Sequence, residues 1–401
     1  MVTQIKEFLR LESAGGILLV IAMMIAMVVV NTDLWPLYES LLGIPLEIRI
    51  GEFEIAKPLL LWINDGLMAI FFFLIGLEVK REVLEGELSD PAQIMLPTVA
   101  AVGGVVVPAL VFTWFNYGDE SAMKGWAIPT ATDIAFALGI LSLLGKRVPA
   151  SLKLFLLTLA IIDDLVAILI IAVFYSVDIS TTSLIIASIA YAVLVVQNLR
   201  GVMRLTSYLV FGLIMWAAVL KSGVHATIAG VLLAFTIPLR HPEGQEHSPL
   251  RNLEQDLHPT VAFVILPIFA FANTGIPLAG MNLETLLSPE PFGIAMGLFI
   301  GKQLGVFGFT WAAVKAGIAK LPTGVGWLEI YGLSVLTGIG FTMSLFISSL
   351  AFEEGYTNFN ANRLGILTGS IVSAIFGYLV LAYALRNKQP YASDDEERAG
   401  D

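Results

Sequence analysis

Two adjacent aspartates, Asp163 and Asp164, stand in a long apolar run of the sequence. Between Lys153 and Asp178 the chain carries no other charge. At about 1.5 Å per helical residue this run spans the hydrocarbon core of a bilayer, so the two carboxyl groups fall near its middle. Each costs about 2.5–3.5 kcal/mol on insertion scales, which favours a functional reason for keeping both.

Carboxylates at this depth can exchange a proton for a small hard cation, because such cations prefer oxygen ligands. Asp163, Asp164, Thr132 and backbone carbonyls would supply those oxygens. Proton and cation then compete for one site, and this competition with alternating access is sufficient for an antiporter. Two titrating carboxyl groups per monovalent cation would make the exchange electrogenic. The alternative for the pair is a polar network that pins helices together.

Two further charges, Asp133 and Lys302, lie at a similar depth in other apolar runs. Interrupted helices leave unpaired N–H and C=O groups, which give their ends partial charges. Asp133 is placed to neutralise positive ends. Lys302 would neutralise negative ends or pair with Asp163 or Asp164, and a purely structural ion pair is its alternative.

The composition is that of a polytopic membrane protein. Of the 401 residues, 57% are hydrophobic and 14% are charged, whereas a soluble domain is nearer a quarter charged. The net charge of −11 comes mostly from loops and from the tail 394–401, and no basic patch indicates nucleic acid. There is no cysteine, so we expect no disulfide, no thiolate chemistry and no zinc held by cysteine. Lys6 and Arg10 precede an apolar run without a cleavage site, which predicts a retained first span.

The fold class predicted is an all-α membrane protein of about twelve transmembrane helices. Apolar stretches between charged or Pro/Gly breaks place them at 12–30, 59–79, 95–116, 121–143, 150–175, 182–198, 205–219, 223–236, 258–274, 290–312, 327–350 and 362–385.

The distribution of basic residues predicts the orientation. With twelve spans, sixteen of the 22 Lys and Arg residues fall in loops on the side of the N-terminus and five on the other, with Lys302 in the membrane. The positive-inside rule therefore predicts cytoplasmic N- and C-termini and supports separate spans at 205–219 and 223–236. We expect one transmembrane domain, 1–387, followed by an acidic, disordered cytoplasmic tail, 388–401.

One outside loop, 45–57, alternates apolar and polar residues around Gly51-Glu52, which predicts a β-hairpin. An isolated hairpin is marginally stable in water. It would pair with the same hairpin of a second chain to form a homodimer, or pack on its own membrane domain.

A weak internal repeat joins 132–138 (TDIAFAL) and 337–343 (TGIGFTM). The first copy runs from outside to inside and the second from inside to outside, so 95–175 and 290–385 would be inverted three-helix repeats. Both copies are poor continuous helices, and paired interruptions of this kind indicate the binding site of a transporter. Ordinary small-residue helix packing is the alternative.

The sequence resembles the bacterial NhaA-type Na⁺/H⁺ antiporters from the first span to the last. The stretches that carry the resemblance are TATDIAFA (130–137), IIDDLVAI (161–168), ILPIFAFANTG (265–275), GK (301–302) and GIGFTMSLFI (338–347). The resemblance implies an inner-membrane protein that exports one Na⁺ or Li⁺ for two protons and is active at alkaline pH. It also implies a dimer through the hairpin and no ATP or organic cofactor.

The resemblance also implies roles for the central residues. Asp163 and Asp164 form the ion site, with Asp164 as the main Na⁺ or Li⁺ ligand, and Thr132 lines it. Asp133 and Lys302 compensate the helix ends, with Lys302 paired to Asp163. Either Lys302 or Asp163 would carry the second proton.

The family's pH response is attributed to a charged cluster at the cytoplasmic mouth. The matching residues are Glu78, Arg81, Glu82, Glu254 and His258, with His225 near the outer end of another span. Each also has a simpler interpretation: a solvated helix cluster for the first three, the start of a helix for His258, and a packed polar residue for His225.

Three other functions are compatible with parts of the pattern. A sodium-coupled symporter of an organic anion is the main alternative, although Lys302 is the one central cation and is assigned to an ion pair. An intramembrane aspartyl hydrolase would lack the Gly-x-Gly-Asp motif and leave Lys302 without a role, so we expect no enzyme. A channel would not need competing carboxylates.

Overall fold

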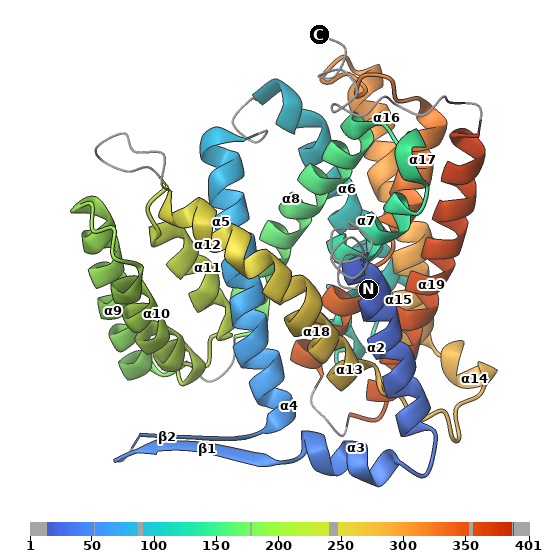
Figure 1. The fold of residues 1–401 in the computed structure, drawn as a ribbon. Helices are drawn as coiled ribbons and strands as arrows, with labels where there is room; N and C mark the ends of the chain where they lie inside the picture. Colours follow the sequence, from blue (N-terminus) through green and yellow to red (C-terminus); the bar gives the residue numbers. More distant parts are fainter. Residues whose placement is uncertain are drawn as a thin grey trace, which may run out of the picture. The chain divides into compact units, whose positions relative to one another are not determined.

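The computed structural model describes residues 14–51, 53–86, 91–176, 179–239, 248–352, 356–386 and 388 (Figure 1). Within these ranges the chain is predominantly helical and carries one two-stranded antiparallel sheet, as predicted. The predictions for 1–13 and for almost all of the acidic tail lie outside the described residues.

The described helices bear out a multi-pass membrane protein. Eight of them are long and apolar enough to cross a bilayer, and up to ten if each of two bent helix pairs is one span. Two further helices, Leu205–Leu220 (α10) and Thr227–Thr236 (α11), are shorter. The turn between them contains Gly223 with φ +82°, so the chain does break there as predicted. The total of twelve spans remains a prediction.

The chain divides into two compact units. Unit 1 contains residues 1–20, 90–167 and 280–401, and unit 2 contains 21–89 and 168–279. Both predicted repeats fall in unit 1 except for residues 168–175, and their inverted relation stays a prediction. Two helices run through a unit boundary, Ala14–Val30 (α2) and Ala150–Phe174 (α8).

The remaining helices of unit 1 are Pro91–Asn116 (α6), Ala122–Gly125 (η3), Ile128–Thr130 (η4), Ile134–Ser142 (α7), Gly145–Arg147 (η5), Leu283–Leu286 (α14), Pro289–Met296 (α15), Gly297–Gly301 (η7), Gln303–Phe307 (η8), Gly308–Lys315 (α16), Trp327–Leu336 (α17), Phe341–Ala351 (α18) and Phe359–Ala384 (α19). Most of them fall within or close to the predicted spans, with breaks inside them, whereas η5 and α14 lie between predicted spans.

In unit 1, α6 packs along the π-helical segments η7 and η8, which flank Lys302. Glycine makes this close approach possible: a Cβ on Gly305 would lie 2.1 Å from the carbonyl oxygen of Gly103. α19 packs against both α15 and α17, and α15 is drawn next to α19 in Figure 1. The segment that carries Lys302 is therefore held by backbone contact with its neighbours.

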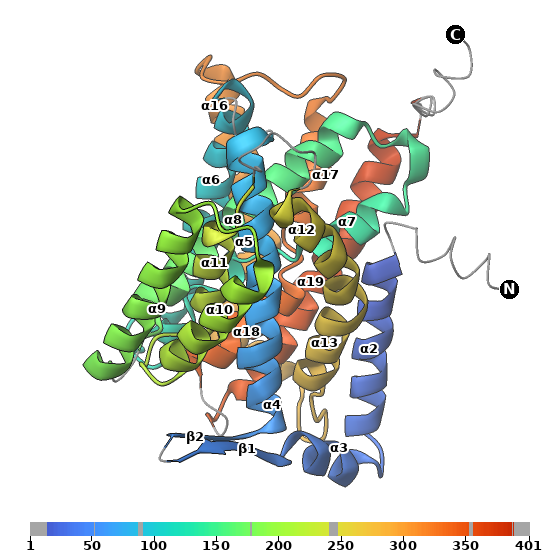
Figure 2. The same cartoon turned by 60° about the vertical axis from the view of Figure 1, so that its left-hand side comes forward.

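Unit 2 consists of a hairpin and further helices. They are Trp35–Leu42 (α3), Pro45–Ile50 (β1), Phe53–Pro58 (β2), Leu59–Trp62 (α4), Ile63–Leu67 (η1), Met68–Glu85 (α5), Thr181–Leu199 (α9), α10, α11, Pro249–Thr260 (α12), Val261–Ile265 (η6) and Leu266–Thr274 (α13). α9 and α10 lie side by side (Figures 1 and 2), and α5 packs on α11 around a core that includes Leu77, Leu194, Tyr208 and Met215.

The predicted hairpin is present, and β1 and β2 pair antiparallel with Ile48 opposite Ile55. Side chains of alternate strand residues share a face, so Leu46, Ile48 and Ile55 lie together. Ile55 is buried, while Leu46 and Ile48 are exposed by 39% and 48%. Part of the apolar face is thus packed within the chain and part is open.

The alternative interpretation of His258 as the start of a helix is wrong. The helix begins nine residues earlier at Pro249, because the Ser248 hydroxyl accepts a hydrogen bond from the Arg251 N–H and proline is favoured in the first turn. Pro259 lies inside the helix, two residues before the π-helical segment η6. His258 consequently projects from a helix that continues on both sides.

Candidate functional site

Two helix interruptions in unit 1 meet at the predicted site. The chain is non-helical at 131–133, before α7, and again at 339–340, before α18. The N–H of Asp133 donates to the carbonyl oxygen of Ile339 at 2.6 Å, and the Thr132 hydroxyl oxygen lies 3.0 Å from the carbonyl oxygen of Thr337. The two breaks are therefore joined by hydrogen bonds.

Asp133 caps both helices that begin at this crossing. Its Oδ1 accepts from the Phe136 N–H at 3.0 Å at the start of α7. Its Oδ2 accepts from the N–H of Thr342 at 3.0 Å and also from the Thr342 hydroxyl, at the start of α18. A carboxylate here faces two positive helix ends, an arrangement that is electrostatically favourable. Sequence reasoning did not identify Thr342, although it lies in the second copy of the repeat.

Lys302 pairs with Asp163. Lys302 Nζ lies 2.7 Å from Asp163 Oδ2, and the two side chains are 0% and 1% exposed. Lys302 stands between η7 and η8, and Asp163 lies on α8. A buried charge pair is tolerated only with good geometry and further hydrogen bonds, because both ions lose their hydration.

Thr132 supplies the further hydrogen bond. Its hydroxyl lies 2.8 Å from Asp163 Oδ2, the same oxygen that accepts from Lys302. Within the described ranges Asp163 Oδ1 is buried and has no hydrogen-bond partner. Asp163 thus has one oxygen engaged by the protein and one with capacity to accept a proton or contact a cation.

Asp164, the next residue of α8, is equally buried, at 1% exposure. Adjacent helical residues point about 100° apart, so the two carboxyl groups face different directions. Across the described segments no three His, Cys, Asp or Glu side chains are grouped as a metal site. A cation bound here would take hydroxyl or carbonyl oxygens besides one or two carboxylates.

Five of the six residues predicted to set the pH response form one cluster in unit 2, between α5 and α12. Arg81 Nε lies 2.9 Å from Glu254 and Arg81 Nη1 lies 2.8 Å from Glu82. His258 Nδ1 lies 3.6 Å from Glu78. Sequence reasoning missed one pair that extends the cluster, Arg251 with Glu85.

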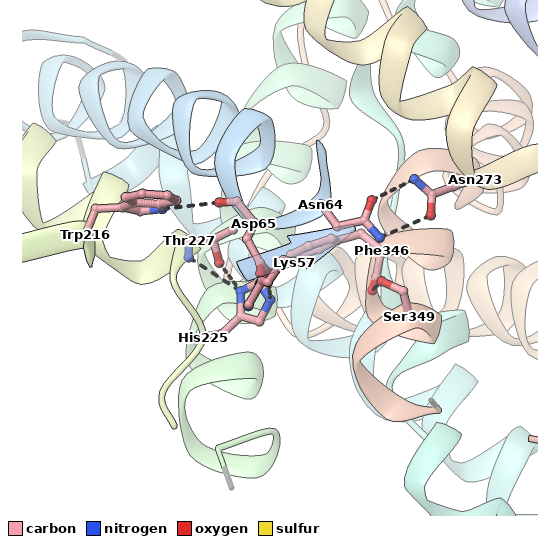
Figure 3. A network of polar contacts seen from close by, with 9 residues as sticks. All are labelled: Lys57, Asn64, Asp65, Trp216, His225, Thr227, Asn273, Phe346 and Ser349. Carbon is pink, nitrogen blue, oxygen red and sulfur yellow. Dashed lines mark hydrogen bonds and ion pairs between the residues drawn. The ribbon is translucent and has the colours of Figure 1, made fainter. Parts of the chain in front are cut away.

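The sixth, His225, belongs to a different network of unit 2 (Figure 3). Its Nε2 lies 3.4 Å from Asp65 Oδ1, and its Nδ1 lies 2.7 Å from the Thr227 hydroxyl. Asp65 Oδ2 also accepts from Lys57 Nζ of β2 at 2.7 Å. Asp65 therefore links the hairpin to the residues just before α11, and neither Asp65 nor Lys57 was identified from the sequence.

Comparison with known proteins agrees with the resemblance. A family model described as Na⁺/H⁺ antiporter 1 matches residues 6–381. The Na⁺/H⁺ antiporter NhaA 2 of Magnetococcus marinus is 57% identical over 95% of this chain and 98% of its own length. The Na⁺/H⁺ antiporter NhaA of Pseudomonas putida is 58% identical over 95% and 97%, and that of Shewanella baltica is 59% identical over 96% and 98%.

Proposed function

The chain belongs to the Na⁺/H⁺ antiporter 1 family, and on that premise we propose that it exports Na⁺ or Li⁺ in electrogenic exchange for protons by alternating access. Asp163 and Asp164 bind the cation or the protons, and Thr132 lines the site. The observation that carries the proposal is the position of the Asp163 carboxylate. It is buried beside two joined helix interruptions, with one oxygen held by Lys302 and Thr132 and the other without a hydrogen-bond partner among the described residues.

Competition between ions follows from the chemistry of these groups. A protonated carboxyl group is a poor cation ligand, whereas the carboxylate is a good one. Entry of Na⁺ beside Asp164 and Asp163 favours release of their protons, and protonation from the other side of the membrane expels Na⁺. Two protons for one Na⁺ move net charge, so the membrane potential contributes to export. Asp133 keeps the crossing intact by compensating the positive helix ends.

The source of the second proton is open to a direct test. If the Lys302–Asp163 pair breaks during transport, either member of the pair could carry that proton. Lys302→Gln removes one of the two titrating groups. Exchange by Lys302→Gln that remains electrogenic assigns the proton to Asp163, and electroneutral exchange assigns it to Lys302.

Exchange is measured in proteoliposomes with an acidic lumen and a pH-sensitive dye inside. NaCl, LiCl and KCl are added outside in turn, across a range of pH. We expect the lumen to become alkaline with Na⁺ and Li⁺ but not with K⁺. Asp164→Asn abolishes the response, and Asp33→Asn, the same change at an exposed residue, keeps it. Absence of Na⁺-driven proton movement, or wild-type exchange by Asp164→Asn, overturns the proposal.

No observation favours the sodium-coupled symporter of an organic anion, and the assay contains inorganic ions alone. Proton exchange under these conditions requires no organic cargo. The protein acts as a transporter without enzymatic chemistry and without a cofactor.

Regulation by pH is proposed to reside in the cluster of Arg81, Glu82, Glu254, Glu78 and His258. Arg81 is shared between two carboxylates, so changes in protonation shift the balance of contacts between α5 and α12. Arg81→Gln is expected to move the pH midpoint of exchange while exchange at the optimal pH stays close to wild type. An unchanged pH profile in Arg81→Gln contradicts this assignment. The same test applied to His225→Ala examines the second network.

We place the protein in the bacterial inner membrane, with cytoplasmic N- and C-termini and surrounding lipid. We also propose that it is a homodimer through the hairpin 45–57, whose apolar face is partly exposed. No further protein partner is proposed.

A further inference from the structure

A buried carboxylate in unit 1, that of Glu290, has no part in the exchange proposed above. Glu290 lies in the first turn of α15 and is 5% exposed. Its Oε1 accepts from the Tyr356 hydroxyl at 2.8 Å and from Asn358 Nδ2 at 2.9 Å, and its Oε2 accepts from Asn362 Nδ2 at 2.8 Å. All three donors are neutral.

No basic side chain within the described part of the chain lies within 4.0 Å of this carboxylate. The guanidinium of Arg363, the nearest basic residue in sequence to its donors, lies over the Phe359 ring at 4.1 Å from the centroid. Arg363 follows Asn362 on α19 and therefore points about 100° away from it. A buried charge without a basic partner is costly, even with three hydrogen bonds and the start of a helix beside it, and a bound cation would offset that cost.

Two buried amide oxygens lie around the same turn without a hydrogen-bond partner among the described residues, Oδ1 of Asn362 and Oδ1 of Asn116. The Asn362 oxygen belongs to the amide that donates to Glu290. Asn116 donates through Nδ2 to the carbonyl oxygens of Phe112 and of Pro289, the residue before Glu290. Rotating either amide would place its oxygen against another acceptor, so both orientations are fixed.

The surroundings of the turn are negative. Burial raises the pKa of the Tyr356 phenol, and the carboxylates of Glu290 and Asp119 raise it further against the effect of a hydrogen bond with Ser121. Tyr356 lies outside the helices, between α18 and α19, and its ring stacks on Phe352 with centroids 4.5 Å apart. Its hydroxyl is thereby fixed against the Glu290 carboxylate.

We propose that Glu290, together with the amide oxygens of Asn362 and Asn116, binds one monovalent alkali cation. Oxygen ligands and a single negative charge suit Na⁺ better than a divalent ion, which usually takes more carboxylates. The bound cation compensates the buried charge and gives the two amide oxygens a partner. It also ties α15 to α6 and α19, which contribute Asn116 and Asn362.

In the predicted topology this end of unit 1 faces the outside, the side to which Na⁺ is exported. The site therefore responds to the exported ion, and that statement rests on the proposed function. The inference that Glu290 binds a cation does not rest on the proposed function, because Glu290 is separate from Asp163 and Asp164.

The test uses the full chain with Asp164→Asn, so that the transport site is disabled. Its melting temperature is measured against NaCl, with choline chloride holding the ionic strength constant. We expect saturable stabilisation by Na⁺, since a ligand that binds only the folded state stabilises it. Adding Glu290→Gln is expected to raise the midpoint Na⁺ concentration at least about tenfold.

The matched control is Glu284→Gln, which removes an exposed carboxylate on α14. It is expected to leave the Na⁺ dependence unchanged. The proposal is overturned if Glu290→Gln and Glu284→Gln respond to Na⁺ alike, or if the Asp164→Asn chain shows no response, as expected if Glu290 is simply protonated. Exchange assays on Asp164→Asn test the transport site separately.

A second measurement avoids any dependence on folding of the Glu290 variant. In the Asp164→Asn chain, hydrogen–deuterium exchange of peptides covering 290–293 and 358–362 is compared in NaCl and in choline chloride. Slower exchange in NaCl supports the site, and identical exchange overturns it.

Discussion

Lys302 Nζ lies 2.7 Å from Asp163 Oδ2, and the two side chains are almost completely buried. The pair joins α8 to the segment between η7 and η8. Its attraction must offset the loss of hydration of two ions, so its net contribution to stability is small compared with the cost of breaking it. Changing one member alone should therefore destabilise the protein more than changing both members together.

Lys302→Gln is expected to lower the free energy of unfolding by about 3–5 kcal/mol, because it leaves the Asp163 carboxylate buried without its counter-charge. Asp163→Asn/Lys302→Gln should recover much of that loss. Denaturation of the purified protein in detergent measures Lys302→Gln, Asp163→Asn and the double variant. If the loss of free energy of unfolding in the double variant equals the sum of the losses in the two single variants, the pair has no coupling energy.

The Thr132 hydroxyl contacts both Asp163 and the Thr337 carbonyl oxygen. Thr132→Val keeps the shape and removes the hydroxyl, and we expect a loss of about 1.5–3 kcal/mol, the usual value for a hydrogen bond to a charged group. Exchange by Thr132→Val should fall because the lining oxygen is gone. Thr132→Ser restores the hydroxyl and serves as the control in the same denaturation and dye assays. Equal behaviour of the two variants would argue against a role for this oxygen.

The central residues could be predicted from the sequence because charges within apolar runs are rare and conspicuous. Asp133, Asp163, Asp164 and Lys302 stand out without any knowledge of the fold. The broken stretches were indicated by Pro and Gly, and the hairpin by its period of two.

The partners of these residues could not be predicted in the same way. The hydrogen bond from Asp133 to Ile339 joins segments about 200 residues apart, and local periodicity carries no information on such pairs. The π-helical segments beside Lys302 leave no pattern in an apolar run. Glu290 was overlooked because it lies at a predicted span end, where a carboxylate is ordinarily solvated.

Asp133 accepts hydrogen bonds from the first turns of both α7 and α18. Asp133→Ala should cost more than the usual 0.5–2 kcal/mol for loss of a helix cap, because two helix starts lose their acceptor. Asp133→Asn keeps one acceptor oxygen but removes the charge, so its melting temperature should lie between those of Asp133→Ala and the wild type. Melting temperatures in detergent give the order, and Asp33→Asn, at an exposed acid, is the control. A wild-type melting temperature for Asp133→Ala would exclude the capping role.

The hairpin offers a direct test of the proposed dimer. Ile48→Lys places a charge on the partly exposed apolar face and should shift the protein toward monomer. Glu47→Lys changes an exposed residue on the opposite face and should leave the dimer intact. Light scattering of the detergent-solubilised protein distinguishes the two states. Deletion of 45–57 with an unchanged oligomeric state would place the dimer contact elsewhere.

The close approach of α6 to the segment that carries Lys302 predicts that a side chain added at Gly305 is destabilising. Gly305→Ala would place a Cβ 2.1 Å from the carbonyl oxygen of Gly103, so the backbones must separate. We expect a loss of stability of about 1–3 kcal/mol and slower exchange, because Lys302 moves with its segment. Gly308→Ala is the matched control, since nothing lies within 4 Å of its Cβ and alanine favours a helix by about 0.5–1 kcal/mol. Comparing the two melting temperatures decides between close packing and helix propensity. A higher melting temperature for both variants would mean that Gly305 and Gly103 lie farther apart than the 2.1 Å between the added Cβ and the carbonyl oxygen implies.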